Sequence, residues 1–425
     1  MDKLLVHGGS TLSGSVHISG SKNASLPILA ATLLTDQPCI IRRVPDVSDT
    51  NYMLQILTAL GAEVERSSGT VRITAAKIDH NAPYDIVRKM RASICVMGPL
   101  LARLHKASVS LPGGCVIGDR PVDLHLKGLE GIGADINMEG GNMVINAPHG
   151  LEGNEVDLRG KHGPTVLGTD NLMMAAVLAK GTTVIESAAC EPEVVDLANF
   201  LNKMGAKISG AGTRRITIEG VETLHGTEHT VIPDRIEAGT FMVAAAMAGC
   251  PKNGVTLHRV CEQDLSPSSQ KLIESGHVVE FNDEGTSCTV KPGHEPKGAN
   301  IVTAPFPGFP TDMQAQFTAL FSVTPGISVV EDTIFPQRFM HCAEMTRMGA
   351  DIKVDNGTAV IHGSHNMSGA PVMASDLRAS AALVLAALRS EGTTEINRLY
   401  HIDRGYENID DKLIMLGANI ERVRE

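Results

Sequence analysis

A glycine between a helix-like segment and a strand-like segment recurs six times along the 425 residues. The glycines stand at positions 61, 133, 205, 276, 349 and 417, so successive copies are 72, 72, 71, 73 and 68 residues apart. Such even spacing indicates one structural unit repeated six times. The six copies of the phrase read Leu60–Val64, Ile132–Ile136, Met204–Ile208, Ser275–Val279, Met348–Ile352 and Leu416–Ile420.

The residue pattern of each repeat predicts strands and helices in the order β-α-β-α-β-β. An amphipathic stretch precedes the glycine, as over 192–204 and 407–416, and the glycine suits a helix C-cap in the left-handed region. The residues after the glycine alternate as in a strand. A glycine-led strand such as 181–185 precedes the amphipathic helix. A small-residue helix with a polar start opens each repeat, at 21–24, 90–93, 169–171, 237–240, 311–314 and 375–378.

The last repeat ends at Glu425 without the final strand that other repeats have, for example at 70–74 and 358–361. Residues 3–7 can supply that strand. The sequence therefore predicts two α/β domains of three repeats each, one spanning 22–232 and the other combining 1–21 with 233–425. A cleft between two such domains is the expected active site. A single solenoid of six repeats is the alternative, and it leaves residues 3–7 unaccounted for.

Composition restricts the kind of partner and the compartment. A net charge of −11 and the absence of tryptophan give no support for a nucleic-acid surface. Neither a signal sequence nor an apolar run of membrane-spanning length occurs, so we expect a cytoplasmic protein that does not bind membranes. The eight cysteines are scattered without a C-x-x-C motif, and no H-E-x-x-H occurs, so we expect no metal and no cofactor.

One cysteine, Cys115, stands in a glycine-rich segment bracketed by Pro112 and Pro121. A nearby cation such as Arg120 would stabilise its thiolate. Cys115 is therefore a candidate nucleophile or proton donor, and the alternative is an inert buried thiol, which we assume for the other seven cysteines.

Cations and acids stand at the ends of the predicted elements. Helix N-termini attract anions, and arginine or lysine placed there favours a phosphate or carboxylate site, although isolated arginines are more often surface residues. Asp312 fits a capping box formed by Thr311 and Gln314, and Asp376 occupies the equivalent place in the sixth repeat, so spacing leaves caps and general bases open for both. The cations in question are Lys22, Arg91, Arg120, Arg338, Arg378 and Arg404.

Seven motifs occur in an order that resembles the UDP-N-acetylglucosamine enolpyruvyl transferases over the whole chain. They begin with Gly-Ser-Lys22-Asn23-Ala and Met-Arg91-Ala-Ser, and continue with Pro-Gly-Gly-Cys115-x-x-Gly-x-Arg120-Pro121-Val122-Asp123-Leu124. The others are Phe-Pro-Thr-Asp312-Met-Gln-Ala-Gln, Arg338-Phe-Met-His, Asp376-Leu-Arg378-Ala-Ser and Tyr-His-Ile-Asp-Arg404-Gly-Tyr-Glu.

The resemblance implies two inside-out α/β barrels, each of three repeats. It also implies transfer of the enolpyruvyl group of phosphoenolpyruvate to the 3′-hydroxyl of UDP-N-acetylglucosamine, with release of phosphate, as the first committed step of peptidoglycan precursor synthesis. The reaction would be an addition followed by an elimination through a tetrahedral ketal. The inhibitor fosfomycin would alkylate Cys115.

Site roles are carried over by motif. Cys115 would give a proton to the methylene carbon of phosphoenolpyruvate, and Asp312 would take the proton of the attacking hydroxyl. Phosphoenolpyruvate would be held by Lys22, Asn23, Arg120 and Arg404. UDP-N-acetylglucosamine would be held by Asn23, Arg91, Arg120, Pro121, Val122, Asp123, Leu124, Thr165, Val166, Asp312 and Ile334, and the cleft would be supported by Arg338, Asp376 and Arg378. The stretch 159–166 departs from the familiar pattern of the family. The departure concerns the assignment of Thr165 and Val166, which lie in this stretch, as contacts of the diphosphate.

Two other functions compete with this interpretation. The enolpyruvyl transferase of aromatic amino-acid synthesis shares the implied fold, but the Pro-Gly-Gly-Cys115 segment favours the nucleotide-sugar enzyme. A catalytically silent UDP-sugar-binding regulatory paralogue could lose the proton donor and still bind. The joint presence of five residues argues against it, namely Cys115, Asp312, Lys22, Arg120 and Arg404.

Overall fold

The computed structural model describes residues 2–111, 122–161, 163–364 and 367–424. Cys115, Arg120 and Pro121, named above as candidate site residues, lie outside the described residues. The chain divides into two compact units, an inserted unit that starts at Gly20 and ends at Ile232, and a terminal unit that combines 2–19 with the residues from Pro233 onwards. The sequence had placed the first division two residues later, before Lys22.

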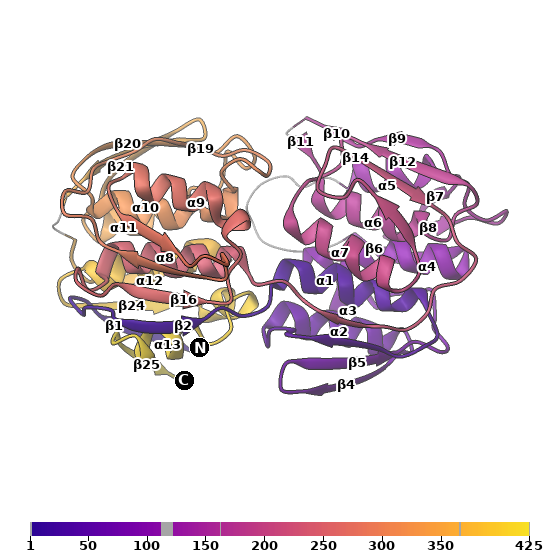
Figure 1. Cartoon of the computed structure of the whole chain (residues 1–425), viewed down its shortest axis with the longest axis horizontal. Coiled ribbons are helices and arrows are strands. Elements are labelled where there is room, and N and C mark those ends of the chain that lie inside the picture. Colours follow the sequence, from indigo (N-terminus) through magenta and orange to yellow (C-terminus); the bar gives the residue numbers. More distant parts are fainter. Residues whose placement is uncertain (1, 112–121, 162, 365–366, 425) are drawn as a thin grey trace. The chain divides into compact units, whose positions relative to one another are not determined.

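The inserted unit holds the first three repeats (Figure 1). Its helices are α1 (Lys22–Ala31), α2 (Ser48–Ala59), α3 (Tyr84–Val87), α4 (Met97–Leu104), α5 (Asp123–Glu130), α6 (Val166–Ala176) and α7 (Pro192–Lys203), with 3-10 helices η1 (Thr32–Leu34) and η2 (Arg91–Val96). Its strands are β3 (Cys39–Arg42), β4 (Glu63–Ser67), β5 (Thr70–Thr74), β6 (Lys106–Ser110), β7 (Asp135–Glu139), β8 (Asn142–Asn146), β9 (Glu155–Asp157), β10 (Arg159–Gly160), β11 (Gly163–Pro164), β12 (Thr182–Glu186), β13 (Lys207–Ser209), β14 (Arg215–Glu219) and β15 (Glu228–Thr230).

The terminal unit holds the other three repeats. Its helices are α8 (Arg235–Ala248), α9 (Glu262–Glu274), α10 (Gln314–Val323), α11 (Met340–Arg347), α12 (Leu377–Arg389) and α13 (Ile409–Met415), with 3-10 helices η3 (Thr311–Met313) and η4 (Leu399–Arg404). Its strands are β1 (Lys3–His7), β2 (Gly14–His17), β16 (Val255–His258), β17 (Val278–Phe281), β18 (Ser287–Lys291), β19 (Ile301–Val302), β20 (Gly326–Glu331), β21 (Asp351–Asp355), β22 (Thr358–Gly363), β23 (Pro371–Met373), β24 (Thr393–Asn397) and β25 (Asn419–Val423).

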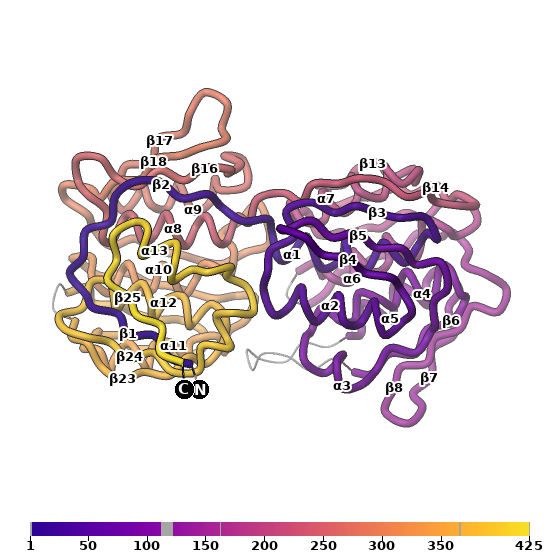
Figure 2. Tube along the Cα trace, turned by 90° about the horizontal axis from the view of Figure 1, so that it is seen from below, coloured from indigo at the N-terminus to yellow at the C-terminus, as the bar shows by residue number. Residues whose placement is uncertain are grey.

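Strand β1 completes the sheet of the sixth repeat, as the sequence predicted. It pairs antiparallel with both β24 and β25, with Leu4 opposite Ile396 and Val6 opposite Ile420. The sheet order β23-β24-β1-β25 matches the order β9-β12-β14-β13 in the third repeat, so β1 takes the position that β14 holds there. The two ends of the chain consequently lie together in Figure 2. The single solenoid is excluded because the N-terminal strand belongs to the last repeat.

The six repeated glycines end their helices in the predicted way. All six have positive φ, from 90° to 105°. In each repeat the N–H of the residue after the glycine donates to the carbonyl five positions earlier, as from Ala62 to Leu57 and from His277 to Leu272. These bonds define the Schellman motif, which satisfies carbonyls that the helix end would otherwise leave free.

In each unit the first helices of the repeats lie inside and the sheets lie outside (Figure 1). Helices α8, α10 and α12 contact one another, and almost every residue of all three is buried. Small residues permit this packing, because alanine and glycine let helix backbones approach closely. The strands bury alternate residues, as Val71 and Ile73 do in β5. This is the inside-out α/β architecture that the sequence predicted.

Several local predictions were wrong. The helix of the third repeat begins at Val166 and that of the fourth at Arg235, both earlier than predicted, since Thr165 and Asp234 cap them. The second repeat has a three-stranded sheet, with a single bridge between Asn81 and Ser108 where other repeats have a fourth strand. Pro83, which has no N–H to donate, stands two residues after that bridge.

No helix among the described residues is long and apolar enough to cross a membrane.

Candidate functional site

Several predicted site residues of the inserted unit lie at the first turns of its inner helices. Lys22 and Asn23 open α1, Arg91 opens η2, and Thr165 is the N-cap of α6. Ser21 caps α1 by accepting the N–H of Ala24 at 3.2 Å. The free N–H groups and the dipole of a helix start both favour anions, so these positions suit a negatively charged ligand.

Lys22 is held by an acid that the sequence did not single out. The Lys22 ammonium lies 2.8 Å from Oδ2 of Asp49, in the first turn of α2, and the side chains of Lys22 and Asp49 are 13% and 1% exposed. A lysine stem is flexible, and the buried carboxylate fixes where its ammonium points. Asp49 therefore orients a cation that the sequence assigned to phosphoenolpyruvate.

Two predicted nucleotide-sugar segments of the inserted unit meet beside Leu124. Asp123 and Leu124 start α5, and a Cβ added at Gly160 would stand 2.8 Å from the Leu124 side chain. Gly160 belongs to the β10–β11 hairpin, which leads directly into Thr165 and Val166. The hairpin was not predicted, and it brings the 159–166 stretch against α5.

Asp312 is the centre of a charged cluster in the terminal unit. Its Oδ1 accepts a hydrogen bond from Nη1 of Arg338 at 2.7 Å, and its Oδ2 accepts one from Nη2 of Arg378 at 3.1 Å. The Asp312 side chain is 28% exposed, whereas those of the two arginines are 7% and 3% exposed. The carboxylate therefore faces the surface of the unit while its cationic partners lie beneath it.

The pKa shifts in this cluster follow from burial and charge. Burial alone would lower the pKa of Arg338, but the carboxylates of Asp312 and Asp376 outweigh it and the pKa is raised. The same opposition, with Asp312 as the strongest opposing charge, raises the pKa of Arg378. Burial lowers the pKa of His341 to about 4, so His341 is neutral beside Asp376 and Arg338 at pH 7. The cluster keeps two permanent cations under one carboxylate.

Asp312 and Asp376, which the sequence could not tell apart, have different roles. Asp376 is the N-cap of α12, accepting the N–H groups of Arg378 at 2.9 Å and Ala379 at 3.2 Å. The capping box predicted around Asp312 does not form, because Thr311 donates its hydroxyl to Asp332 and α10 begins only at Gln314. Asp376 therefore stabilises a helix start, whereas Asp312 is bound by arginine side chains.

A buried layer of polar side chains supports this cluster from below. The ring of Tyr406 lies 5.4 Å from the guanidinium carbon of Arg378, and its hydroxyl is 2.9 Å from that of Thr240. Nε2 of Gln316 donates to the Tyr406 hydroxyl at 3.2 Å and to the backbone carbonyl of Asp312 at 2.9 Å. Buried hydrogen bonds of this kind fix side-chain positions, so the backbone of Asp312 is tied to α8 and α10.

Ile334 follows β20 in a loop held by Asp332, a residue that sequence reasoning missed. Oδ1 of Asp332 accepts the N–H groups of Ile334 at 3.0 Å and Phe335 at 2.8 Å. An aspartate directly after a strand, followed two residues later by a backbone donor, is a turn pattern that could have indicated Asp332.

Arg404 ends η4 rather than starting a helix, and it precedes Gly405, which packs against Leu377.

The seven cysteines that the structure describes are free thiols, and only some are buried as assumed. Cys39, Cys95, Cys288 and Cys342 are buried, whereas Cys190, Cys250 and Cys261 are half-buried. Within the ranges that the structure describes, no group of three or more histidine, cysteine, aspartate or glutamate side chains could hold a metal ion.

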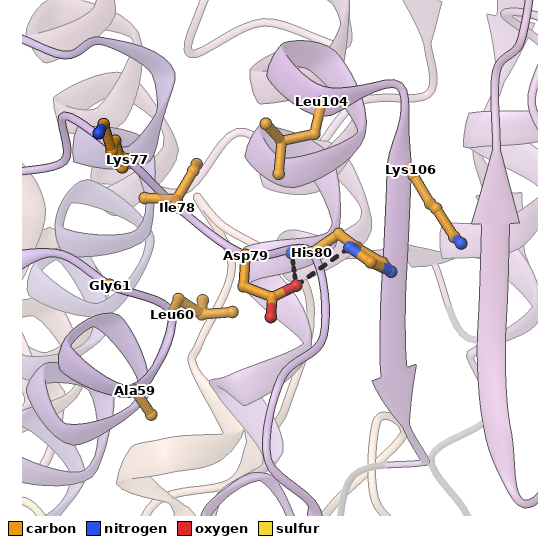
Figure 3. Close-up of a pocket in the computed structure, with 9 residues that line it drawn as sticks. All are labelled: Ala59, Leu60, Gly61, Lys77, Ile78, Asp79, His80, Leu104 and Lys106. Carbon is orange, nitrogen blue, oxygen red and sulfur yellow. Dashed lines mark hydrogen bonds and ion pairs between the residues drawn. The ribbon is translucent and has the colours of Figure 1, made fainter.

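Two hollows of the inserted unit lie away from these residues. One of about 610 Å³ is lined by Ala59, Lys77, Asp79, His80 and Lys106 among others (Figure 3). The other, of about 740 Å³, is lined by residues that include Arg103, His105 and Lys180. Both lie at C-terminal ends of helices, since Ala59 ends α2 and Arg103 lies in the last turn of α4. None of the predicted site residues lines either hollow, so neither belongs to the candidate site.

Comparisons with solved structures define the class. The enolpyruvyl transferase NikO from Streptomyces tendae superposes with a TM-score of 0.89 at 25% identity, covering 99% of both chains. EPSP synthase from Acinetobacter baumannii superposes with a TM-score of 0.75 at 18% identity over the full length of both chains, which shows the fold alone. The family model of EPSP synthase (3-phosphoshikimate 1-carboxyvinyltransferase) matches residues 6–413. The protein is thus an enzyme of the enolpyruvyl transferase class.

Curated relatives narrow the class to one family. UDP-N-acetylglucosamine 1-carboxyvinyltransferase from Akkermansia muciniphila is 70% identical over 423 residues, covering 100% of this chain and 99% of the relative. The enzyme of the same name from Methylacidiphilum infernorum is 57% identical over 425 residues, with the same coverage. The chain belongs to the UDP-N-acetylglucosamine 1-carboxyvinyltransferase family, and its substrates are small molecules.

Proposed function

We propose that the protein transfers the enolpyruvyl group of phosphoenolpyruvate to the 3′-hydroxyl of UDP-N-acetylglucosamine and releases phosphate, the first committed step of peptidoglycan precursor synthesis. The sugar oxygen adds to C2 of phosphoenolpyruvate while C3 gains a proton, which gives a tetrahedral ketal. The new methyl group then loses a proton as the bond from C2 to the phosphate oxygen breaks. The product is an enol ether, and the reaction takes place in the cytoplasm.

The arrangement around Asp312 carries the proposal. A partly exposed carboxylate above two buried guanidinium groups is held in one position by charge-assisted hydrogen bonds. In this proposal Asp312 takes the proton of the attacking hydroxyl, a task that needs an ionised acceptor within hydrogen-bond reach. Arg338, Asp376 and Arg378 support it, and Asp312 also contacts the sugar nucleotide.

Phosphoenolpyruvate carries a phosphate and a carboxylate, and the proposal assigns it to four residues. Lys22 and Asn23 bind it at the start of α1, together with Arg120 and Arg404. Cations and helix N–H groups stabilise a bound dianion and the charge that develops as phosphate leaves. The ion pair between Lys22 and Asp49 supports this assignment, because it holds the ammonium at the helix start.

The sugar nucleotide is assigned to a larger set. Arg91 and Asn23 lie at helix starts, while Leu124 packs beside the hairpin that precedes Thr165. The proposed contacts are Asn23, Arg91, Arg120, Pro121, Val122, Asp123, Leu124, Thr165, Val166, Asp312 and Ile334.

Cys115 is proposed as the acid that gives its proton to C3, and fosfomycin would then inhibit by alkylating the same sulfur. A thiol is a suitable donor because its pKa of about 8.5 in free cysteine lies near neutral pH. These roles rest on the motif around Cys115.

The test is phosphate release from phosphoenolpyruvate, measured with and without UDP-N-acetylglucosamine, for the wild type, for Cys115→Ser and for enzyme treated with fosfomycin. We expect release that requires the sugar nucleotide, disappears after fosfomycin treatment and falls at least 100-fold in Cys115→Ser. Cys250→Ser, which alters a half-buried thiol remote in sequence, is the matched control and should keep its activity and its sensitivity to fosfomycin. Binding of the sugar nucleotide without any phosphate release would instead identify a regulatory paralogue.

A further inference from the structure

We propose that Asp332 is a positioning residue for the transfer reaction, and this inference rests on the proposed function. Its carboxylate is 1% exposed and accepts four hydrogen bonds. Two come from the backbone of the Ile334 loop, and two come from the hydroxyls of Thr303 and Thr311. One buried carboxylate thus joins a proposed sugar-nucleotide contact to the residue next to Asp312.

Asp332 makes two sets of hydrogen bonds, here called arms, one toward Asp312 and one toward the Ile334 loop. The arm toward Asp312 runs through Thr311. The Thr311 hydroxyl donates to Oδ2 of Asp332 at 2.7 Å, which leaves its oxygen lone pairs available as acceptors. Nη1 of Arg338 donates to the hydroxyl oxygen of Thr311 at 3.3 Å and also to Oδ1 of Asp312 at 2.7 Å. Asp332 therefore sets the rotamer of Thr311, and Thr311 sets the place of the guanidinium that holds the Asp312 carboxylate.

The other arm fixes the loop after β20. Oδ1 of Asp332 accepts the N–H groups of Ile334 and Phe335, and it also accepts the hydroxyl of Thr303 at 2.9 Å. Thr303 in turn accepts the N–H of Thr333 at 3.0 Å. Each oxygen of Asp332 thus serves a different task, Oδ2 the arm to Asp312 and Oδ1 the loop of Ile334.

This division of tasks permits a selective substitution. Asp332→Asn keeps an oxygen that can occupy the Oδ1 position and accept from the loop. Its amide nitrogen, placed at Oδ2, cannot accept the Thr311 hydroxyl and would donate to it instead. Thr311→Val removes the same arm from the other side. Thr303→Val removes the hydroxyl's bonds to Oδ1 of Asp332 and to the N–H of Thr333, both of which belong to the arm that holds the Ile334 loop.

The experiment measures kcat and KM for phosphate release, and the Tm, of five proteins. They are the wild type, Asp332→Asn, Thr311→Val, Thr303→Val and the Asp332→Asn/Thr311→Val double variant. We expect kcat to fall about tenfold in Asp332→Asn and in Thr311→Val, the effect of one hydrogen bond to a charged group, with KM for the sugar nucleotide changed less than threefold. Because both substitutions break one arm, the double variant should lose no more than twofold beyond the larger single loss. Thr303→Val should keep kcat within twofold of wild type.

Three results would overturn the inference. They are an unchanged kcat in Asp332→Asn, losses that multiply in the double variant, and a kcat that simply follows the folded fraction given by the Tm. A wild type that releases no phosphate with both substrates would refute the proposed function itself, so failure of the two proposals is distinguishable.

Discussion

The two units share one architecture but differ in the side chains that begin or precede their inner helices. In the inserted unit the helix starts bear Lys22, Arg91 and the hydroxyl of Thr165. In the terminal unit Asp234 and Asp376 cap α8 and α12, and Asp312 lies in η3 directly before α10, while Arg235 and Arg378 stand in the first turns of α8 and α12. Carboxylates at these positions therefore distinguish the terminal unit, since the corresponding helix starts of the inserted unit bear a lysine, an arginine and a hydroxyl.

The acids of the terminal unit also differ among themselves. Asp234 and Asp376 accept backbone N–H groups as helix caps, which is the ordinary use of aspartate at that position. Asp312 is bound by two buried arginines and is partly exposed. At Asp312, arginine side chains therefore take the place of the backbone donors that the two caps have.

The largest expected effect separates Asp312 from Asp376. We expect Asp312→Asn to lower kcat for phosphate release at least 100-fold, since an amide cannot take a proton from the hydroxyl. Asp376→Asn should lower kcat less than tenfold, because asparagine caps a helix as well as aspartate does. Asp376→Ala should lose about 1 kcal/mol of unfolding free energy. Equal losses of kcat in the two asparagine variants would remove the distinction between the acids.

A smaller effect concerns the cationic helix start. We expect Lys22→Ala to raise KM for phosphoenolpyruvate at least tenfold and to lower the free energy of unfolding by about 2 kcal/mol, because buried Asp49 loses its ammonium partner. The Lys22→Ala/Asp49→Asn double variant should recover stability without recovering KM. Recovery of both would make the pair purely structural. Urea denaturation and steady-state kinetics measure the two quantities.

The smallest effect is a pH dependence of stability in the first turn of α8. Burial, opposed by Lys412, raises the pKa of Glu237 from 4.5 to about 7. The folded protein then binds a proton that the unfolded chain lacks, so this group's contribution to stability declines as the pH rises from about 4.5 to 7. Glu237→Gln should flatten the unfolding free energy over that interval. An unchanged slope in urea titrations from pH 4.5 to 7.5 would contradict the shifted pKa.

The fold was predictable to the extent that local chemistry repeats. All six copies share one sequence pattern, an amphipathic helix followed by a glycine that must adopt positive φ. This pattern located Gly61 and Gly417 equally well. The strand at Lys3–His7 was predictable because one repeat lacked its final strand. The single bridge that replaces the fourth strand in the second repeat and the β10–β11 hairpin left no such pattern in the sequence, since each depends on a few tertiary hydrogen bonds.

The candidate site was predictable only in the residues that stand in motifs. Lys22 and Asp312 stand in recognisable motifs, as do Arg338 and Arg378, which bind Asp312, but Asp49 and Asp332 do not. Asp49 lies 27 residues after Lys22, and Asp332 lies 20 residues after Asp312, each in a segment without a motif of its own. Only tertiary packing brings these acids to their partners, and for that reason the sequence also left open which of Asp312 and Asp376 is a cap.

The measurement that tests the central claim most directly is mass analysis of the product formed from phosphoenolpyruvate and UDP-N-acetylglucosamine in D₂O. Addition followed by elimination places a solvent-derived proton on C3 before the ketal decomposes. The account predicts enolpyruvyl-UDP-N-acetylglucosamine with deuterium in the methylene group of part of the product, formed together with phosphate. A product without deuterium, or no coupled product at all, would contradict it.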